Sequence, residues 1–316
     1  MKILTSSLEE CIVNDIQTNG RDPDFALALL PINAQFEARL AELSAAMPNT
    51  LIAGCNAHIQ FLPSGLFEDG VVQQFWFSNP SHRIWCEVVS IDEDKNAVTD
   101  HAVKRLCQDK PDAAILLVDG VNYPVDQLLD AIRTTDELKD LTIVGGLASK
   151  PTDSKSLSDG IGPWVFLNGE IHKDSALILG LQGIEINTQI IRGWEPASPG
   201  YTVTEACGNI LRTIDGRSAV DWYADFFAIE GHENQLPLAS YGFPLIIDGP
   251  CPSRKNIYRT MLAYDEPKGC VTFYGDIHTG DHIRLGIGHA GSLVDAATMM
   301  TKTDADAYLL FSCVAR

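Results

Sequence analysis

The sequence predicts an α/β (mixed α+β) protein made of two interlocked sheet-and-helix halves. In the first half, short apolar runs typical of buried strands alternate with amphipathic helical patterns, and strand pairs joined by tight turns lie among them. In addition, residues 112–120 (DAAILLVDG) are similar to residues 306–316 (DAYLLFSCVAR). A divergent duplication of one half would explain that similarity.

The chain opens with a predicted βαβ unit. Residues 25–32 (FALALLPI) have the composition of a buried strand, and residues 50–54 form a second short strand. Between them, apolar side chains at helical spacing predict a helix with Phe36, Leu40 and Leu43 on one face. Parallel pairing of the two strands is the usual outcome for such a unit.

The rest of the first half adds further strands and helices in order. Asn168-Gly169 is a typical two-residue hairpin turn. Residues 193–200 (GWEPASPG) concentrate helix- and strand-breaking residues, so we expect one domain over residues 1–192 and another over residues 193–316. The remaining first-half elements are strands at 71–77, 83–91, 113–118, 141–144, 164–167 and 176–179, and helices at 98–107 and 125–134.

The second half mixes helices with strands. Residues 202–205 (TVTE) and 218–221 (SAVD) both resemble capping boxes, so a helix is expected to start at each. A further helix is expected over residues 293–300. Strands are expected at residues 257–263, 270–274, 282–287 and 308–313.

Composition limits the classes of function. A formal net charge of -19 argues against a surface for nucleic-acid phosphate or anionic membrane, because either would need clustered Lys and Arg. We expect neither a secretion signal nor a bilayer span, and therefore a cytoplasmic location. The eight cysteines show no CxxC pair, so no disulfide framework or structural zinc site is expected.

Several short blocks together resemble the FIST family. They are GCNAHIQFLPSGLFEDGVVQQFWF at 54–77, VGGLASK at 144–150, WVFLNGEIHKDSALILGLQG at 164–183 and the run at 192–223. The resemblance implies a FIST N-like domain followed by a FIST C-like domain that looks short at its C-terminus. It also implies an intracellular sensory protein of signal transduction that binds a small ligand.

A subset of that family resembles haem-binding nitric-oxide sensors, which regulate a partner histidine kinase or a diguanylate cyclase or phosphodiesterase. The resemblance therefore makes noncovalent haem b a candidate cofactor, held by one histidine in an apolar pocket. The candidate axial ligands, in order, are His58, His278 and His289. His58 lies where the family more often has a Ser-Thr-Ala-Gly-Glu sequence, although a satisfied, partly buried histidine is the plainer interpretation.

The other candidate ligand-binding residues lie at the edges of predicted strands and in the family-like blocks. An open turn at Gly145-Gly146 would form one edge of a pocket. Arginines could instead clamp the carboxylate of an amino acid, giving a sensor without haem. The candidate set is Cys55, Asn56, His58, Gly145, Gly146, Arg259, Cys313 and Arg316.

Enzymatic function is the less favoured class. The sequence contains no complete dinucleotide fingerprint, no GxSxG elbow and no Walker loop. Cys55 or Cys313 could act as a thiol nucleophile, but buried inert thiols are more common. We therefore expect a sensor rather than an enzyme, with a thiol-dependent enzyme and a ligand-free interaction domain as alternatives.

Overall fold

The computed structural model describes residues 1–7, 21–31, 35–57, 60–62, 65–67, 72–91, 95–148, 162–227, 243–250, 254–299, 305 and 307–313. The chain divides into two compact units. Unit 1 comprises Met1–Thr188 together with Ala305–Phe311, and unit 2 comprises Gln189–Asp304 together with Ser312–Arg316. The path of the chain thus returns to unit 1 near its C-terminal end.

The first sheet of unit 1 is built around the predicted βαβ unit. Strands β2 (Phe25–Pro31) and β3 (Leu51–Ala57) pair in parallel, and helix α2 (Phe36–Ala46) connects them, which confirms that prediction. The full order is β1-β6-β2-β3-β10-β11. The added strands, all antiparallel to their neighbours, are β1 (Lys2–Ser7), β6 (Val72–Phe77), β10 (Val165–Leu167) and β11 (Glu170–His172). A separate small hairpin joins β4 (Gln60–Leu62) to β5 (Gly65–Phe67).

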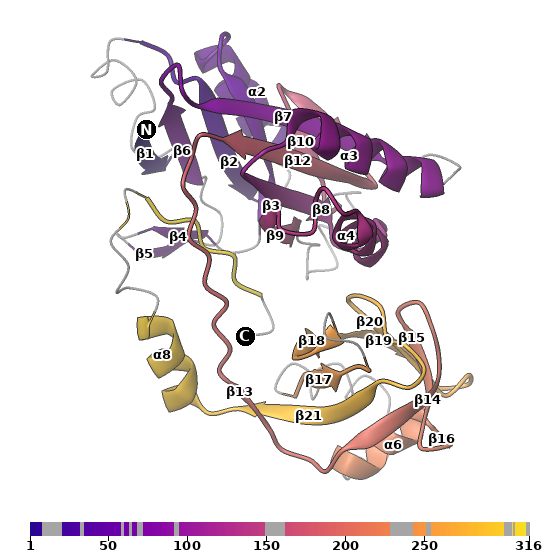
Figure 1. Ribbon diagram of the computed structural model, residues 1–316. Helices are drawn as coiled ribbons and strands as arrows, with labels where there is room; N and C mark the ends of the chain where they lie inside the picture. The colour runs from indigo at the N-terminus through magenta and orange to yellow at the C-terminus, as the bar shows by residue number, and fades with distance from the viewer. Residues whose placement is uncertain are drawn as a thin grey trace. The chain divides into compact units, whose positions relative to one another are not determined.

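The second sheet of unit 1 has the order β7-β12-β8-β9. Strands β8 (Ala113–Asp119) and β9 (Thr142–Ala148) are parallel, while β7 (Arg83–Ser90) and β12 (Ser175–Gln182) are antiparallel to their neighbours. Helices α3 (Lys95–Asp109) and α4 (Val125–Thr134) lie together beside this sheet in Figure 1. Strand β9 forms its edge.

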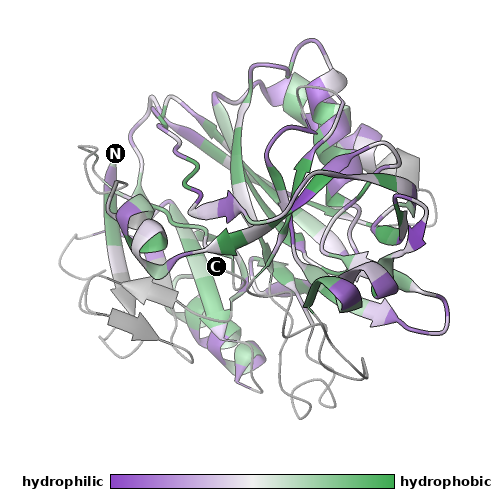
Figure 2. Ribbon diagram, turned by 90° about the horizontal axis from the view of Figure 1, so that it is seen from below, coloured by the Kyte–Doolittle hydropathy of each residue, from purple (hydrophilic) through white to green (hydrophobic). Residues whose placement is uncertain are grey.

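Three apolar clusters hold unit 1 together. One lies between the first sheet and α2, a second between the second sheet and its helices, and a third joins the two sheets face to face. Strand alternation distributes the side chains of β3: Ile52 enters the α2 cluster, while Ala53 and Cys55 enter the cluster between the sheets, called the inner core below. Figure 2 shows the same pattern, with apolar residues along the strands and polar residues in the loops.

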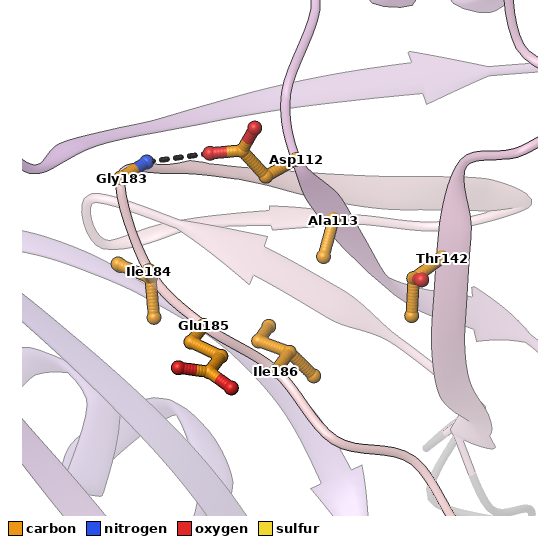
Figure 3. A pocket seen from close by; sticks show the side chains of 7 residues that line it. All are labelled: Asp112, Ala113, Thr142, Gly183, Ile184, Glu185 and Ile186. Atoms are coloured by element: carbon orange, nitrogen blue, oxygen red, sulfur yellow. Dashed lines mark hydrogen bonds between the residues drawn. The ribbon is translucent and has the colours of Figure 1, made fainter.

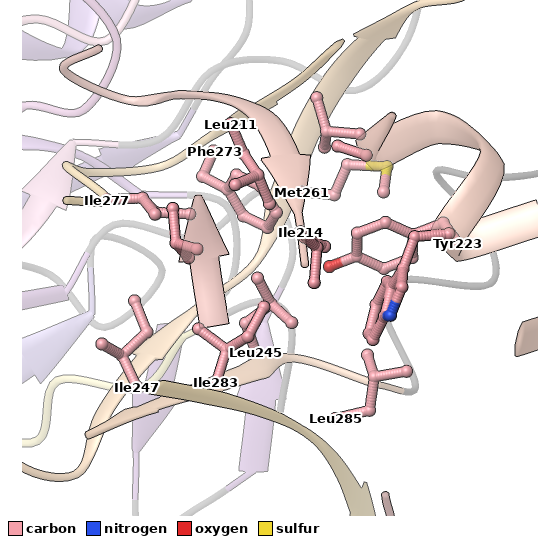
Figure 4. Packing of buried hydrophobic residues seen from close by; sticks show 14 of the residues in the cluster. Leu211, Ile214, Tyr223, Leu245, Ile247, Met261, Phe273, Ile277, Ile283 and Leu285 are labelled. Atoms are coloured by element: carbon pink, nitrogen blue, oxygen red, sulfur yellow. The ribbon is translucent and has the colours of Figure 1, made fainter. Parts of the chain in front are cut away.

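The described part of unit 2 contains an antiparallel sheet and the helices α6 (Ala219–Phe227) and α8 (Ala290–Met299). Tyr223 of α6 and Phe273 lie within its apolar core (Figure 4). The sheet order is β18-β17-β21-β14-β15-β20-β19, with β13 on β21 and β16 on β15. The strands are β13 (Trp194–Pro196), β14 (Tyr201–Cys207), β15 (Ile210–Ile214), β16 (Arg217–Ser218), β17 (Leu245–Asp248), β18 (Ile257–Arg259), β19 (Met261–Asp265), β20 (Cys270–Phe273) and β21 (His282–Gly288).

The structure confirms the α/β class and corrects two elements. The helix expected at 202–205 is part of strand β14, because Val203 is buried in the sheet core and the run pairs with β15. Residues 308–313, expected as a strand, belong to none. The other capping box is confirmed: α6 begins at Ala219, and the Asp221 N–H donates to Ser218 Oγ over 3.4 Å. The Asn168-Gly169 turn is also confirmed, with φ of 50° and 87°.

Candidate functional site

The end of strand β3 places two of the predicted site residues side by side with their side chains on opposite faces. Cys55 lies in the inner core and is 5% exposed, whereas Asn56 is fully buried. Burial raises the pKa of the Cys55 thiol to about 12, so this sulfur is a protonated thiol at neutral pH. The thiol is therefore poorly suited to nucleophilic attack.

The Asn56 side chain has an unusual hydrogen-bonding state. Its Nδ2 donates to the Gly162 carbonyl over 2.5 Å, and its backbone N–H donates to the Trp164 carbonyl over 3.1 Å. Its Oδ1, although buried, accepts no hydrogen bond from any described residue. A buried acceptor without a donor lowers the stability of the fold by about 1–3 kcal/mol, so a hydrogen bond to this oxygen would be favourable.

Asn56 also occupies a favourable place in the fold. It is next to last in β3, at the carboxyl end of the parallel β2–β3 pair. Ligands of open α/β sheets bind outside the carboxyl ends of such strands. Trp164, whose carbonyl accepts the Asn56 N–H, packs edge to face on Phe36, with ring centroids 5.6 Å apart. In a buried position an unsatisfied carbonyl is costly, and a hydrogen bond to it is correspondingly strong.

At Gly145 and Gly146 in β9, other atoms of the protein occupy the space that a side chain would need. A Cβ on Gly145 would lie 1.9 Å from the carbonyl oxygen of Leu116 in the neighbouring strand. A Cβ on Gly146 would lie 2.9 Å from Cδ1 of the Phe311 ring. Strands β3 and β9 contact each other, and Cys55, Val144 and Phe311 share the inner core. The structure thus corrects the open turn predicted at Gly145-Gly146: both glycines lie within strand β9, and Phe311 packs against Gly146.

Arg259, the last residue of β18, contacts the turn of unit 2 that contains His278. The Arg259 guanidinium packs on Gly275, where a Cβ would lie 2.7 Å from Cζ, and its Nε donates to the Asp276 carbonyl over 3.2 Å. His278 is exposed, and its backbone N–H donates to Asp281 Oδ2 over 2.9 Å. The dense polar run at 276–282 is therefore organised as a turn.

The carboxylate of Asp281 is engaged by an arginine. Asp281 is fully buried, and Arg254 donates to it twice, through Nε over 3.2 Å and through Nη2 over 2.6 Å. In the described parts of the chain, no group of three or more His, Cys, Asp or Glu side chains could hold a metal ion.

The remaining predicted residues fall in separate places. His289 is exposed just before α8, where its carbonyl accepts the Leu293 N–H over 3.0 Å, so it is a helix-entry residue. Cys313 is exposed. His58 and Arg316 lie outside the described residues.

Sequence reasoning missed a hollow of about 320 Å³ at the end of the second sheet where strands β8 and β9 begin. It begins at Ala113 and Thr142, the first residues of β8 and β9. Asp112 Oδ2 at its rim accepts the Gly183 N–H over 2.7 Å (Figure 3). The hollow is lined by Asp112, Ala113, Thr142, Gly183, Ile184, Glu185 and Ile186. These residues carry no motif in the sequence that would have marked them.

Sequence reasoning also missed Asp119, a buried carboxylate at the carboxyl end of β8. It accepts the backbone N–H groups of Val121 and Asn122 over 2.8 and 3.0 Å, and that of Asp174 over 3.2 Å. The carboxylate therefore ties the β8–α4 turn to the β11–β12 turn. An aspartate closing an apolar run was the available signal, and it indicates a capped turn rather than catalysis.

Comparison with protein families matches almost the whole chain. The FIST N domain matches residues 24–217, and the FIST C domain matches residues 219–316. A comparison with curated proteins gives no significant match. The family boundary falls between 217 and 219, whereas the compact units divide between Thr188 and Gln189, so the domain boundary predicted at 192 and 193 stays a prediction. Among the described residues, no helix combines the length and hydropathy needed to cross a bilayer.

Proposed function

Because the chain belongs to the FIST family, whose domains are associated with sensory functions in signal transduction, we propose that it binds a small polar molecule at the carboxyl end of β3. In this proposal, occupancy of that site is the signal that the protein passes on. The observation that carries it is the buried, unsatisfied Oδ1 of Asn56.

The geometry of Asn56 favours a ligand that donates a hydrogen bond. Nδ2 is already engaged by the Gly162 carbonyl, so the amide offers an acceptor and not a donor. An amine, amide or hydroxyl group of a ligand would satisfy Oδ1. Because Asn56 is fully buried, that hydrogen bond would form away from bulk water.

Signal transfer requires a ligand that distinguishes two conformations of the protein. The resemblance to family members that regulate enzymes suggests a histidine kinase, a diguanylate cyclase or a phosphodiesterase as the partner. The proposal includes one of these enzymes as the partner.

A haem-based nitric-oxide sensor is the finer form that the family resemblance suggests. The described histidine candidates do not fit it, because His278 and His289 are exposed and an axial ligand needs an apolar pocket. The hollow near Asp112 and Glu185 does not fit haem either, since it is open to solvent and has two acidic side chains in its lining. The haem form therefore depends on His58, and a sharp Soret band after haemin reconstitution, lost in His58→Ala, is its test.

The carboxylate-sensor form depends on arginine. Arg259 is packed on Gly275 and bonded to the Asp276 carbonyl, which leaves Arg316 as the candidate clamp. A thiol-dependent enzyme is the third form, and the raised pKa of Cys55 argues against this cysteine as its nucleophile.

A thermal-shift screen of the full chain tests the proposal. Wild type, Asn56→Leu and the control Asn187→Leu, which adds the same leucine at an exposed position of unit 1, are heated with amines, amino acids, polyols, amides and carboxylates. A ligand at one hundred times its Kd stabilises the folded state by about 2.7 kcal/mol. We expect at least one compound with a hydrogen-bond donor to raise Tm in wild type and in the control, and much less in Asn56→Leu. A screen in which no compound separates Asn56→Leu from the other two proteins would refute the site.

A further inference from the structure

A short segment from near the C-terminal end lies on unit 1. Residues Ala305–Phe311 are grouped with unit 1, although the residues before and after them belong to unit 2. In this segment the Tyr308 carbonyl accepts a hydrogen bond from Gln74 Nε2 over 2.9 Å. Gln74 lies in β6 and is 7% exposed, so the segment reaches a buried polar group of the first sheet.

The side chains of residues 307–311 alternate between the inner core and solvent. Leu309 and Phe311 pack against the inner core, whereas Tyr308 and Leu310 are 56% and 44% exposed. The Phe311 ring fills the space that Gly146 leaves by having no side chain. One end of the segment is thus held at β6 and the other at β9.

The attachment does not use strand pairing. Residues 307–311 belong to no strand, and β9 is an edge strand of its sheet. A segment held by inserted side chains instead of a backbone ladder opens locally more easily than a paired strand. Leu309, Phe311 and the Gln74 bond are therefore contacts on which the attachment of the segment depends.

We propose that residues 307–311 form a reversible latch on unit 1, with Phe311 as its plug beside Gly146 and Gln74 as its polar anchor. The docking surface includes Gln74 of β6 and Gly146 of β9, and its occupant is this segment of the same chain. The residues before and after the latch belong to unit 2, so release of the latch frees this stretch of the chain from unit 1. This gives the protein a two-state element independent of ligand identity.

Chymotrypsin cleavage of the intact chain tests the latch. Cleavage after Tyr308 requires the segment to leave its docking surface, so its rate follows the released population when opening is fast. We expect Phe311→Ala to raise this rate at least tenfold and the control Leu310→Ala, a truncation of an exposed neighbour, to leave it unchanged. Equal rates in the two variants, or cleavage that occurs only together with cleavage inside β8, would overturn the proposal.

An engineered disulfide provides a second test that does not depend on whether Phe311→Ala folds. Gly146→Cys combined with Phe311→Cys, in a Cys313→Ser background, places two thiols where the ring now touches β9. We expect the oxidised protein to resist cleavage after Tyr308 and the reduced protein to be cleaved rapidly. The same cleavage rate in both redox states would overturn the latch even if the alanine variant behaved as expected.

Discussion

We expect Arg254→Met to lower the free energy of unfolding of unit 2 by about 3–5 kcal/mol, because it leaves a buried carboxylate without its positively charged partner. Asp281 is 0% exposed and the Arg254 side chain is 12% exposed, so water does little to screen either charge. Arg254 donates to both carboxylate oxygens. Close packing enforces this geometry: a Cβ on Gly249 would lie 2.6 Å from Arg254 Cβ and 2.8 Å from Asp281 Oδ1.

A surface ion pair in the same unit supplies the control. Arg217 and Asp225 meet at 2.5 Å, but their side chains are 52% and 67% exposed. Arg217→Met should therefore have little effect on the free energy of unfolding. Urea unfolding followed by tryptophan fluorescence, with buried Trp222 as the reporter in unit 2, measures both variants. A loss for Arg254→Met as small as that for Arg217→Met would refute the reasoning.

Three further predictions concern buried polar groups. Tyr123→Phe should leave the free energy of unfolding unchanged or raise it by up to about 1 kcal/mol, because the buried Tyr123 hydroxyl has no partner among the described residues; a urea midpoint well below wild type would contradict this. Burial raises the pKa of Tyr123 from 10.0 to about 12, so the unfolded chain loses the hydroxyl proton at a lower pH than the folded protein. The free energy of unfolding should therefore fall as the pH rises from 10 to about 12. The urea midpoint should fall less steeply over this pH range in Tyr123→Phe than in wild type. At neutral pH, iodoacetamide should label exposed Cys207 well before buried Cys55, and peptide mass spectrometry showing equal rates would count against the inner core as described.

The sequence pattern correctly predicted those helices and strands that pack against elements close to them in the sequence. The βαβ unit was readable because Phe36, Leu40 and Leu43 repeat at helical spacing between two apolar runs, and all three are buried. The run at 202–205 misled because a capping box and a β-branched strand share residue types, and pairing with β15 decided the outcome.

The candidate site was only partly readable, for a related reason. Asn56 was identified by its place after an apolar run, but its unsatisfied Oδ1 depends on the distant Gly162 carbonyl. Gly146 was expected in an open turn at the edge of a pocket, but it lies within strand β9 against Phe311, whose position follows from the tertiary fold. Arg259 was a candidate carboxylate clamp in the sequence, and the turn at Gly275 that engages it is formed by a separate segment.

We propose that Asn56 Oδ1 receives a hydrogen bond from a small-molecule ligand. Isothermal titration calorimetry of the best compound from the thermal-shift screen, against wild type and Asn56→Leu, measures this most directly. Loss of the acceptor should weaken binding by roughly 5- to 150-fold, the equivalent of about 1–3 kcal/mol. Equal Kd values for the two proteins would contradict the claim.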